Sequence, residues 1–232
     1  MAAPNQTIFI TGTDTGVGKS LLTALLLNHL RKSGVRALAM KPFCSGGRED
    51  VELLQALQPG ELPDSMANPF YFEEPVAPLV AARNHGRRIQ LTEVVARITE
   101  VGAHCDYLLI EGAGGLLVPL GESYGIVDLI GEIACQVIVV AANRLGTLNH
   151  TQLTVRVLEQ FKRPPSAVVL MDVAQPDFSS KTNPELLAEL LPNLEIIQLA
   201  YLKGEKRNLD LVRLYENQLD SPLNRVKNAI SA

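Results

Sequence analysis

The sequence predicts an α/β fold in which a parallel sheet is covered by helices on both faces, and three observations predict it. Short apolar runs rich in β-branched residues alternate with segments of helical periodicity along the 232 residues. These runs are nearly continuous in apolar residues, which is typical of strands buried on both faces of a parallel sheet. Several runs end in turns of glycine and small residues, where ligands bind in such sheets. With 47% hydrophobic residues, we expect a single domain over residues 1–232.

The expected strands are bounded by turn-forming residues. Gly34 stops the first helix before the second strand, and Pro42 ends that strand. The expected strands cover residues 8–10, 35–40, 107–110, 137–142, 167–173 and 195–199.

The expected helices follow these strands and carry apolar residues at helical spacing. In the fourth of them, Leu91, Val94, Val95, Ile98 and Val101 form one apolar face for packing on the sheet. The expected helices cover residues 21–30, 49–54, 78–86, 91–101, 147–161 and 184–191, and a polar helical tail begins at Asn208.

Residues 59–78 form a segment rich in proline and acidic residues that contains Phe70, Tyr71 and Phe72 in succession. Flexible linkers are usually poor in aromatic residues, and three adjacent rings need a surface to cover. We therefore expect an ordered excursion whose rings pack on the core or on a partner subunit.

Charge and cysteine content exclude several functional classes. The formal net charge is −4 without a long basic run, so no nucleic-acid partner is expected. No apolar window is long enough for a membrane span and no signal sequence precedes the first strand, so we expect a cytoplasmic protein. Cys44, Cys105 and Cys135 are odd in number and widely spaced, which argues against disulfides and a zinc cluster. These properties favour an enzyme that acts on small molecules.

The first strand leads into a glycine-punctuated turn from Gly12 to Ser20 that is typical of a phosphate-binding loop. Its glycines let backbone amides curl around an anion, and the next helix adds unpaired amides and a favourable dipole. Lys19 would reach the β- and γ-phosphates, and the Ser20 hydroxyl would bind Mg²⁺. Five residues, rather than the usual four, separate Gly12 from Gly18. A glycine-rich turn without a ligand is the alternative.

Lys41 follows the second strand, at an end of the sheet where ligands bind. The alternative is a solvated loop lysine, because lysine is usually exposed. Asp50 lies in the acidic first turn of the next helix, which the helix dipole explains, but its carboxylate could equally turn inward to a metal.

Glu111 ends a buried strand and is followed by a turn of small residues, Gly112 to Gly115. An acid at the tip of a strand beside a phosphate loop can hold Mg²⁺ or a water in its shell. The glycines would let a nucleotide or substrate approach the backbone. The alternative is a carboxylate that caps a turn.

A further helix is expected to begin after Gly146, with its amino end facing the strand ends. The amides of Thr147, Leu148 and Asn149 would suit a carboxylate ligand. Capping of the helix by the Thr147 side chain explains the same residues equally well.

In order and spacing together, these segments resemble the dethiobiotin synthetase family. Its members use CO2 and ATP to close a cyclic urea on 7,8-diaminopelargonic acid in biotin biosynthesis. The resemblance covers most of the chain. It rests on residues 12–20, Lys41–Pro42 with Ser45–Gly46, residues 111–115, Leu145–Gly146 with Asn149–His150 and, more weakly, Phe72 to Pro78.

The resemblance implies a P-loop NTPase-like fold, a ligase that uses ATP and Mg²⁺, and a homodimer. It implies Lys41, Lys19 and Thr15 as catalytic residues. Metal ligation is implied for Ser20, Asp50 and Glu111. Substrate binding is implied for Ser45 and, from the other subunit, for Gly146, Thr147, Leu148 and Asn149. Nucleotide binding is implied for Gly16, Val17, Gly18, Lys19, Ser20, Leu21, Asp50, Glu111, Gly112, Ala113, Gly114, Met171, Asp172, Ala200, Tyr201 and Leu202.

The chain departs from the family pattern at positions around this site. Gly16 stands where many relatives carry glutamate, and Met171 stands where the family has an asparagine that contacts adenine. Leu79 and Ala200 replace a common histidine and a usual proline. The missing asparagine leaves the preference for ATP over other nucleoside triphosphates open.

Two other functions fit a phosphate loop on this fold. An amide-forming synthetase of the cobyrinic-acid type usually carries a glutaminase domain, for which this chain has no room. A partner-regulated partitioning ATPase would carry a further lysine near the start of the loop, and positions 11–17 contain none.

Overall fold

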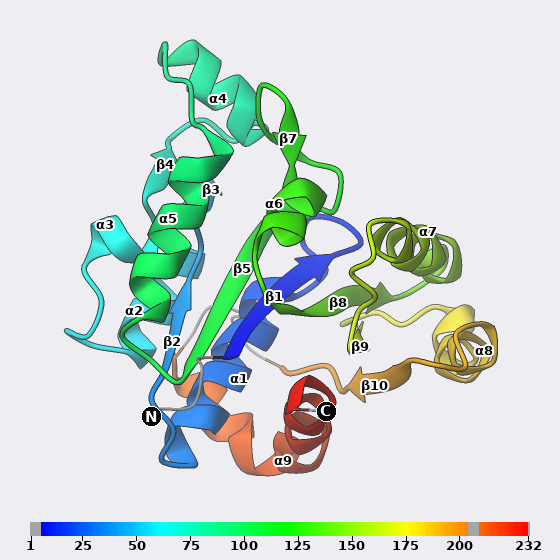
Figure 1. Ribbon diagram of the computed structural model, residues 1–232. Coiled ribbons are helices and arrows are strands. Elements are labelled where there is room, and N and C mark those ends of the chain that lie inside the picture. Colours follow the sequence, from blue (N-terminus) through cyan, green and yellow to red (C-terminus); the bar gives the residue numbers. More distant parts are fainter. Residues whose placement is uncertain (1–5, 204–208, 232) are drawn as a thin grey trace.

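The computed structural model describes residues 6–203 and 209–231, and its centre is a six-stranded sheet (Figure 1). All neighbouring strands run parallel, in the order β10–β9–β8–β1–β5–β2. The strands are β1 (Gln6–Gly12), β2 (Ala37–Met40), β5 (Tyr107–Gly115), β8 (Gln136–Asn143), β9 (Ala167–Asp172) and β10 (Glu195–Leu199). The prediction of a parallel sheet is confirmed, and each expected strand takes part in it.

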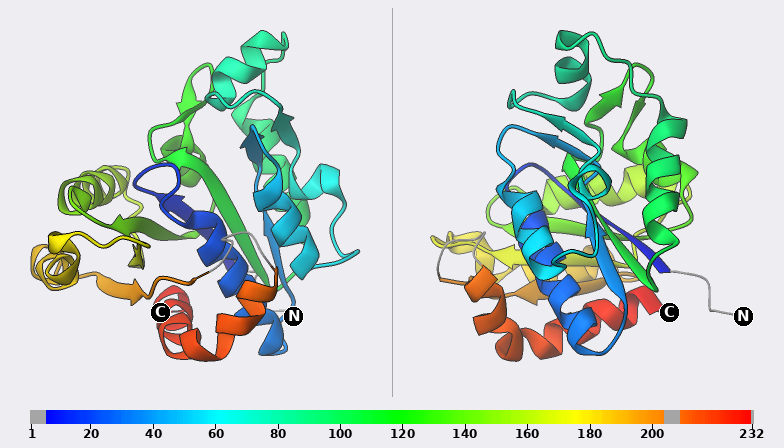
Figure 2. Two further views of the ribbon diagram at one scale, coloured as in Figure 1. Left: turned by 180° about the vertical axis from the view of Figure 1, so that it is seen from behind. Right: turned by 90° about the vertical axis from the view of Figure 1, so that its left-hand side faces the viewer.

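Helices cover both faces of this sheet, and the right-hand view of Figure 2 shows α5 on one side with α1 and α2 on the other. One face carries α1 (Lys19–Lys32), α2 (Glu49–Leu57) and α9 (Leu209–Ser231). The opposite face carries α5 (Leu91–Gly102), α6 (Ile126–Glu132) and α7 (Thr147–Gln160). At the edge of the sheet, α8 (Asn183–Leu190) packs beside β10. The prediction of helices on both faces is confirmed.

Two apolar cores, one under each helical layer, explain the continuous apolar runs. On β1, Ile8 and Ile10 pack in the core under α1, whereas Phe9 packs in the core under α5. Each of the three is at most 1% exposed. Burying a side chain of this size stabilises the fold by about 1.5–3 kcal/mol. Because successive strand residues point to opposite faces, both must be apolar when both faces are covered.

The segment between β2 and β5 includes residues 59–78, which are ordered, as predicted. It contains α3 (Asp64–Ala67), α4 (Pro78–Asn84) and the two-stranded parallel sheet of β3 (Phe43–Ser45) and β4 (Phe70–Phe72). Phe70 and Phe72 are buried in the core under α5, and Phe70 stacks on Phe43 with ring centroids 4.9 Å apart. Tyr71 is half-buried, and the Arg48 guanidinium lies 5.0 Å from its ring centroid. Of the two expected surfaces for these rings, the core is the one that the two phenylalanines cover.

The sequence analysis assigned no element between residues 116 and 136, where the structure has three. An antiparallel pair, β6 (Pro119–Gly121) and β7 (Tyr124–Gly125), is followed directly by α6. A short 3-10 helix, η1 (Phe178–Lys181), was also not expected. Segments of two to seven residues are too short to show a periodic pattern, although Ile126, Leu129 and Ile130 of α6 are buried.

The expectation of a polar tail is wrong for α9. Leu211, Leu219, Leu223, Val226 and Ile230 are buried in the core shared with α1. Their spacing of three, four or eight residues places them on one face of the helix. The tail is helical, as expected, but it is amphipathic and completes one helical layer. Asn208, the expected start of the tail, lies outside the described residues.

The three cysteines are free thiols. Burial raises the pKa of Cys105 to about 11 and that of Cys135 to about 12, so both remain protonated at neutral pH. Burial also raises the pKa of Cys44, whose Sγ donates to the carbonyl oxygen of Gly47 at 3.2 Å. None of the helices within the described ranges combines the length and the hydrophobicity needed to cross a bilayer.

Candidate active site

The phosphate loop joins β1 to α1, and its backbone fits the predicted role. Gly18 precedes the helix with φ +107°, a left-handed conformation that favours glycine. A Cβ atom on Gly18 would also lie 2.9 Å from Cγ of Met171, so the position has no room for a side chain. Lys19 folds back over the loop, and its Nζ donates to the carbonyl oxygen of Asp14 at 2.8 Å.

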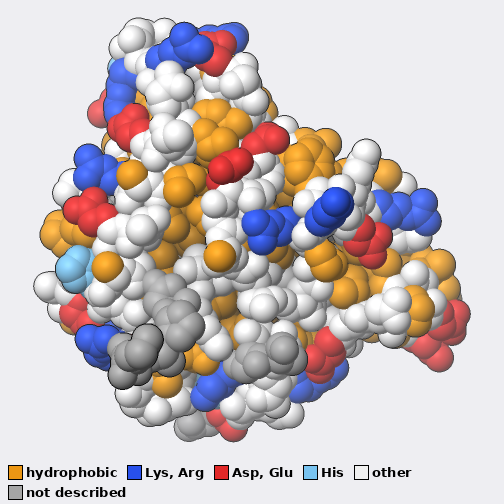
Figure 3. Space-filling view, viewed as in Figure 1, with side chains coloured by type: hydrophobic (Ala, Val, Ile, Leu, Met, Phe, Trp, Pro, Cys, Tyr) orange, Lys and Arg blue, Asp and Glu red, His pale blue; other side chains and the backbone are white. Residues whose placement is uncertain are grey.

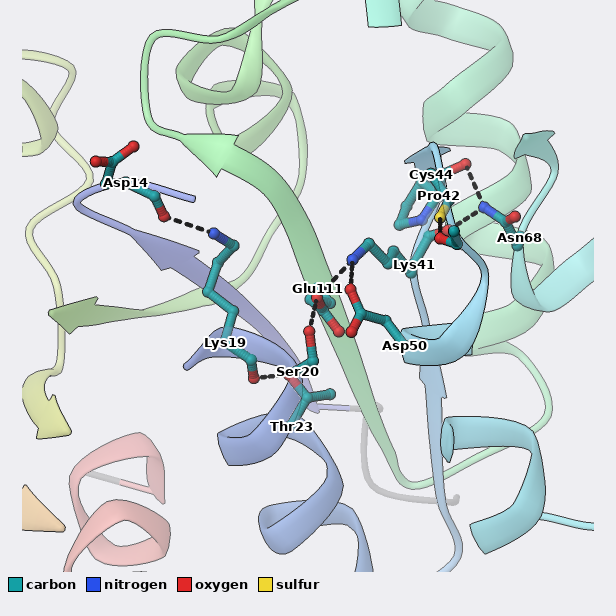
Figure 4. A network of polar contacts seen from close by, with 11 residues as sticks. Asp14, Lys19, Ser20, Thr23, Lys41, Pro42, Cys44, Asp50, Asn68 and Glu111 are labelled. Atoms are coloured by element: carbon teal, nitrogen blue, oxygen red, sulfur yellow. Dashed lines mark hydrogen bonds and ion pairs between the residues drawn. The ribbon is translucent and has the colours of Figure 1, made fainter. Parts of the chain in front are cut away.

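Four polar side chains converge beside this loop: Ser20 of α1, Lys41 just after β2, Asp50 of α2 and Glu111 of β5 (Figure 4). Glu111 does not end its strand as expected, because β5 continues through the small residues to Gly115. Lys41 lies directly after β2, and its Nζ donates to Asp50 Oδ2 at 2.5 Å and to Glu111 Oε1 at 2.8 Å. The Ser20 hydroxyl donates to the same Glu111 oxygen at 2.7 Å. Lys41 is therefore not a solvated loop lysine, and Asp50 does turn inward from the first turn of α2.

The pKa values of the two lysines of the site are shifted in opposite directions. Burial alone would lower the pKa of Lys41, but the carboxylates of Glu111 and Asp50 outweigh it and hold that pKa above its usual value. Burial lowers the pKa of Lys19 to about 8, with Glu111 opposing the shift and the charge of Lys41 adding to it. The Lys41 side chain is therefore always charged at neutral pH, whereas Lys19 loses its proton at a pH only slightly above neutral.

A cavity of about 260 Å³ lies over these groups. It is lined by Thr15, Gly16, Gly18, Lys19, Ser20, Leu21, Lys41, Asp50, Glu111 and Gly114. All of these residues are among those predicted for the site. Ser45, Gly112 and Ala113 were also predicted, but they do not line this cavity.

A second, narrower pocket of about 40 Å³ begins on the other side of the loop. It is lined by Gly16, Val17, Gly18, Leu21, Ala142, Met171, Asp172, Val173, Ala200, Tyr201 and Leu202. Five of the residues predicted to bind the nucleotide, Met171, Asp172, Ala200, Tyr201 and Leu202, therefore lie together. The phosphate loop separates their pocket, which is called the base pocket after its proposed ligand, from the charged cavity. The walls are mostly apolar, with Asp172 as the charged exception.

The start of α7 has a glycine in the left-handed conformation and no side-chain cap. Gly146 is the N-cap residue, with φ +94°, and no side chain caps the helix. The Thr147 hydroxyl is buried and lies 3.5 Å from that of Thr151, so capping by Thr147 does not explain this sequence. The first-turn amides of Leu148 and Asn149 have no intrahelical partner. This turn lies outside both the 260 Å³ cavity and the base pocket.

One observation indicates that the carboxylates of Asp50 and Glu111 suit Mg²⁺. Glu111 Oε2 is fully buried and has no hydrogen-bond partner among the described residues, although such a group is costly to leave unpaired. No group of three His, Cys, Asp or Glu side chains suited to a metal occurs in residues 6–203 and 209–231. Mg²⁺ does not require one, because it is usually held by one or two carboxylates with water and substrate phosphates.

Two buried asparagines near the site were missed by the sequence analysis. Asn68 donates to the carbonyl oxygen of Lys41 at 2.7 Å and so holds the backbone that carries this lysine. Nothing in the sequence marks Asn68, because it lies in the irregular segment before β4. Asn143 ends β8 and binds side chains from two other segments. A polar residue that closes an apolar strand was the available signal.

Sequence comparison identifies relatives over most of the chain. A family described as an AAA domain matches residues 6–201. The chain is 38% identical to the ATP-dependent dethiobiotin synthetase BioD of Anaeromyxobacter sp. (strain Fw109-5), over 84% of this chain and 90% of that protein. It is 35% identical to the protein of the same name from Bacillus subtilis (strain 168), over 78% of this chain and 81% of that one.

Solved structures with the same fold are more distant in sequence. The MinD cell division protein of Aquifex aeolicus superposes with a TM-score of 0.62 at 16% identity, over 97% of each chain. A ParA family ATPase from Chlorobium tepidum TLS gives 0.56 at 13% identity, over 98% of this chain and 100% of that one. These two similarities show a P-loop ATPase fold alone, whereas the higher identities above show the family. The chain belongs to the ATP-dependent dethiobiotin synthetase family.

Proposed function

We propose that this protein closes a cyclic urea on 7,8-diaminopelargonic acid, using CO2 and ATP and giving dethiobiotin, ADP and phosphate. The observation that carries the proposal is the position of Lys41. Its ammonium is buried beside the phosphate loop and held between Asp50 and Glu111, so a fixed positive charge faces the place where a γ-phosphate would lie. The family membership supports the same reaction.

The first chemical step needs stabilisation of negative charge. One substrate amine adds CO2 and loses a proton to give a carbamate anion, and a carbamate oxygen then attacks the γ-phosphorus while the bond to ADP breaks. Lys19 and Lys41 supply positive charge for the carbamate and for the transferred phosphoryl group, and Thr15 lines the same cavity. Charge that is already in place at these positions lowers the barrier without reorganisation of solvent.

Mg²⁺ is the metal we propose here, with Ser20, Asp50 and Glu111 as its ligands. When bound, it would neutralise charge on the nucleotide phosphates. All three side chains now bond to one another or to Lys41, so they are already gathered in one place.

The second step is ring closure within the bound intermediate, a carbamic–phosphoric anhydride. The remaining amine attacks its carbonyl carbon and loses a proton, and the phosphate leaves with the electron pair of the broken carbon–oxygen bond. Both reacting groups belong to one molecule, so holding its chain in a bent conformation supplies much of the acceleration. We propose that Ser45 and the turn at residues 146–149 hold the substrate in this way, with the substrate carboxylate at the amides of Leu148 and Asn149. The Thr147 amide, which was also predicted for this role, donates to the carbonyl oxygen of Arg144 at 3.1 Å.

We further propose a homodimer in which the turn at residues 146–149 serves the site of the partner. Its position outside the 260 Å³ cavity supports this arrangement. Beside the turn, the β5–β6 loop and α7 border an apolar groove of about 420 Å³, in which Leu117 is 68% exposed and Leu153 is 55% exposed. Figure 3 shows apolar side chains over the neighbouring helices α7 and α8. A second copy of the chain would cover this surface, and light scattering of the purified protein tests the proposal.

A cytoplasmic location completes the proposal. Three free thiols in one chain are typical of a reducing compartment. The substrates ATP and CO2 are also available there.

The reaction is tested by phosphate release from ATP with Mg²⁺ and bicarbonate, with and without diaminopelargonic acid, while the cyclic-urea product is followed by mass. We expect phosphate and product in equal amounts, both dependent on the diamine. ATP hydrolysis without that dependence would favour the partner-regulated ATPase instead.

A further inference from the structure

Asn143 is the last residue of β8 and is 1% exposed. It is bonded both to the base pocket and to the turn before α7, which belong to separate parts of the proposed site. Its neighbour across the sheet is Asp172, the last residue of β9, in the base pocket. Two residues after it comes Leu145, where the turn into α7 begins. The side chain of Asn143 is therefore placed between the nucleotide base and the proposed carboxylate subsite.

The amide of Asn143 is fully used in this position. Its Nδ2 donates to Asp172 Oδ1 at 2.8 Å and to the carbonyl oxygen of Ser180 at 3.0 Å, and its Oδ1 accepts from Asn183 at 3.0 Å. The main-chain carbonyl oxygen of Asn143 also accepts from the Ser180 hydroxyl at 2.9 Å. A carboxylate and a carbonyl oxygen can only accept, so the amide nitrogen must face them. Asn143 consequently has one orientation.

On the nucleotide side, the network fixes a carboxylate. Gln198 donates to both oxygens of Asp172, at 2.9 and 3.0 Å, so donors from Asn143 and Gln198 hold this group against the pocket wall. Without these donors the carboxylate of Asp172 would lose the bonds that hold its orientation, and it could turn toward the nucleotide. It would then repel a polyanionic ligand or displace the base.

On the other side, the network fixes the turn before α7. Asn183 also donates to the carbonyl oxygen of Arg144 at 3.3 Å. Asp177 accepts from the amide of Leu145 at 2.7 Å and from the Ser180 hydroxyl at 3.5 Å. The two residues before Gly146, the N-cap residue of α7, are thereby hydrogen-bonded to the η1 segment and, through Asn183, to Asn143.

We infer that Asn143 is a positioning residue that sets the base pocket and the carboxylate subsite at once. The inference rests on the proposed function, because it takes the turn at residues 146–149 as the carboxylate subsite. In the proposed homodimer that turn serves the partner, so one side chain would position the nucleotide in its own protomer and, separately, the diamine bound at the site of the other protomer.

Three substitutions separate the two arms of the network. Asn143→Ala removes the hub, Gln198→Ala loosens only the Asp172 side, and Asp177→Ala loosens only the turn. Gln198 and Asp177 are exposed, so both single-arm variants should fold. Asn143→Thr, which is polar but brings no second carboxylate against Asp172, serves as a second hub variant if the alanine does not fold.

Two affinities are measured for each variant. The first is the Kd of the β,γ-methylene analogue of ATP by calorimetry, and the second is the KM of the diamine at saturating ATP, together with kcat. We expect the hub variants to raise both Kd and KM about fivefold or more. Gln198→Ala should raise only the nucleotide Kd, and Asp177→Ala only the diamine KM, with kcat near that of the unaltered protein.

Other patterns overturn the inference. A hub variant that lowers kcat but leaves both affinities unchanged would show a purely structural residue. A hub variant that changes one affinity alone, or single-arm variants that change neither, would show that the network does not link the subsites. If the unaltered protein shows no diamine-dependent turnover, the proposed function fails instead, and the nucleotide Kd values of Asn143→Ala and Gln198→Ala still decide the Asp172 arm.

Discussion

The two halves of the proposed nucleotide site differ in the forces that shape them. At the phosphate end, Lys41, Asp50 and Glu111 form a buried cluster of charges whose distances are 2.5–2.8 Å. At the base end, Met171 and its apolar neighbours form a narrow pocket whose single carboxylate already accepts bonds from Asn143 and Gln198. Ligand binding at the phosphate end should therefore depend on charge, whereas binding at the base end should depend on the shape of the pocket.

This difference predicts where substitutions matter most. Removing a charge from the buried cluster leaves its partners unpaired in a water-poor site and removes charge stabilisation from the transition state. Changing an apolar wall of the base pocket alters contacts that any nucleotide can make. Substitutions in the charged cluster should thus have large effects on turnover. Substitutions in the base pocket should have small effects on the choice of nucleotide.

Lys41→Ala should give the largest effect, a fall in kcat of about a hundredfold or more, because a fixed positive charge beside the reacting groups is lost. The ATP affinity and the thermal unfolding of the variant are measured alongside. Lys32→Ala, at the exposed end of α1, is the matched control and should retain full turnover. Near-normal turnover of Lys41→Ala would remove this lysine from the chemistry.

Glu111→Gln should come next, because it keeps the shape of the side chain but removes the charge of the buried carboxylate. We expect the Mg²⁺ concentration for half-maximal activity to rise at least about tenfold. Glu100→Gln, which alters only an exposed pair with Arg97 on α5, is the control. An unchanged Mg²⁺ titration in Glu111→Gln would contradict the proposed ligand.

The pH dependence of nucleotide binding should be smaller and specific to Lys19. Its pKa of about 8 means that the ammonium is charged below this pH and becomes neutral as the pH rises through it. We expect ATP affinity, measured by calorimetry, to fall severalfold above about pH 8 as this charge is lost. Lys19→Met has no charge to lose, so its weaker binding should be flat over this range. The same slope in both proteins would assign the effect to another group.

Met171→Asn should give the smallest effect, because it adds one hydrogen-bonding amide to the base pocket. We expect the ratio of the Kd values for ATP and GTP to change by about two- to tenfold, the range for a single hydrogen bond. Met171→Leu preserves the apolar wall and should leave the ratio unchanged. If the asparagine variant also leaves it unchanged, the side chain at this position does not read the base.

Features that are local in the sequence could be predicted from it, whereas features that depend on distant partners could not. The sheet followed from continuous apolar runs, and the positions of Lys19, Lys41 and Glu111 followed from motifs at strand ends. Asn68 and Asn143 could not be found in this way, because each acts through partners that are distant in sequence or lie in irregular segments. The short elements at residues 119–132 carry too little periodicity to predict. The apolar face of α9 was readable from its spacing but was taken for a polar tail.

The most direct test of the proposed reaction follows oxygen atoms from CO2. If a carbamate oxygen attacks the γ-phosphorus, turnover with freshly added ¹⁸O-labelled CO2 should place one ¹⁸O in each phosphate released and leave one in the urea carbonyl. Mass spectrometry of both products within the first turnovers measures this before the label exchanges with water. Phosphate without ¹⁸O, formed while labelled cyclic urea accumulates, would contradict the carbamate route.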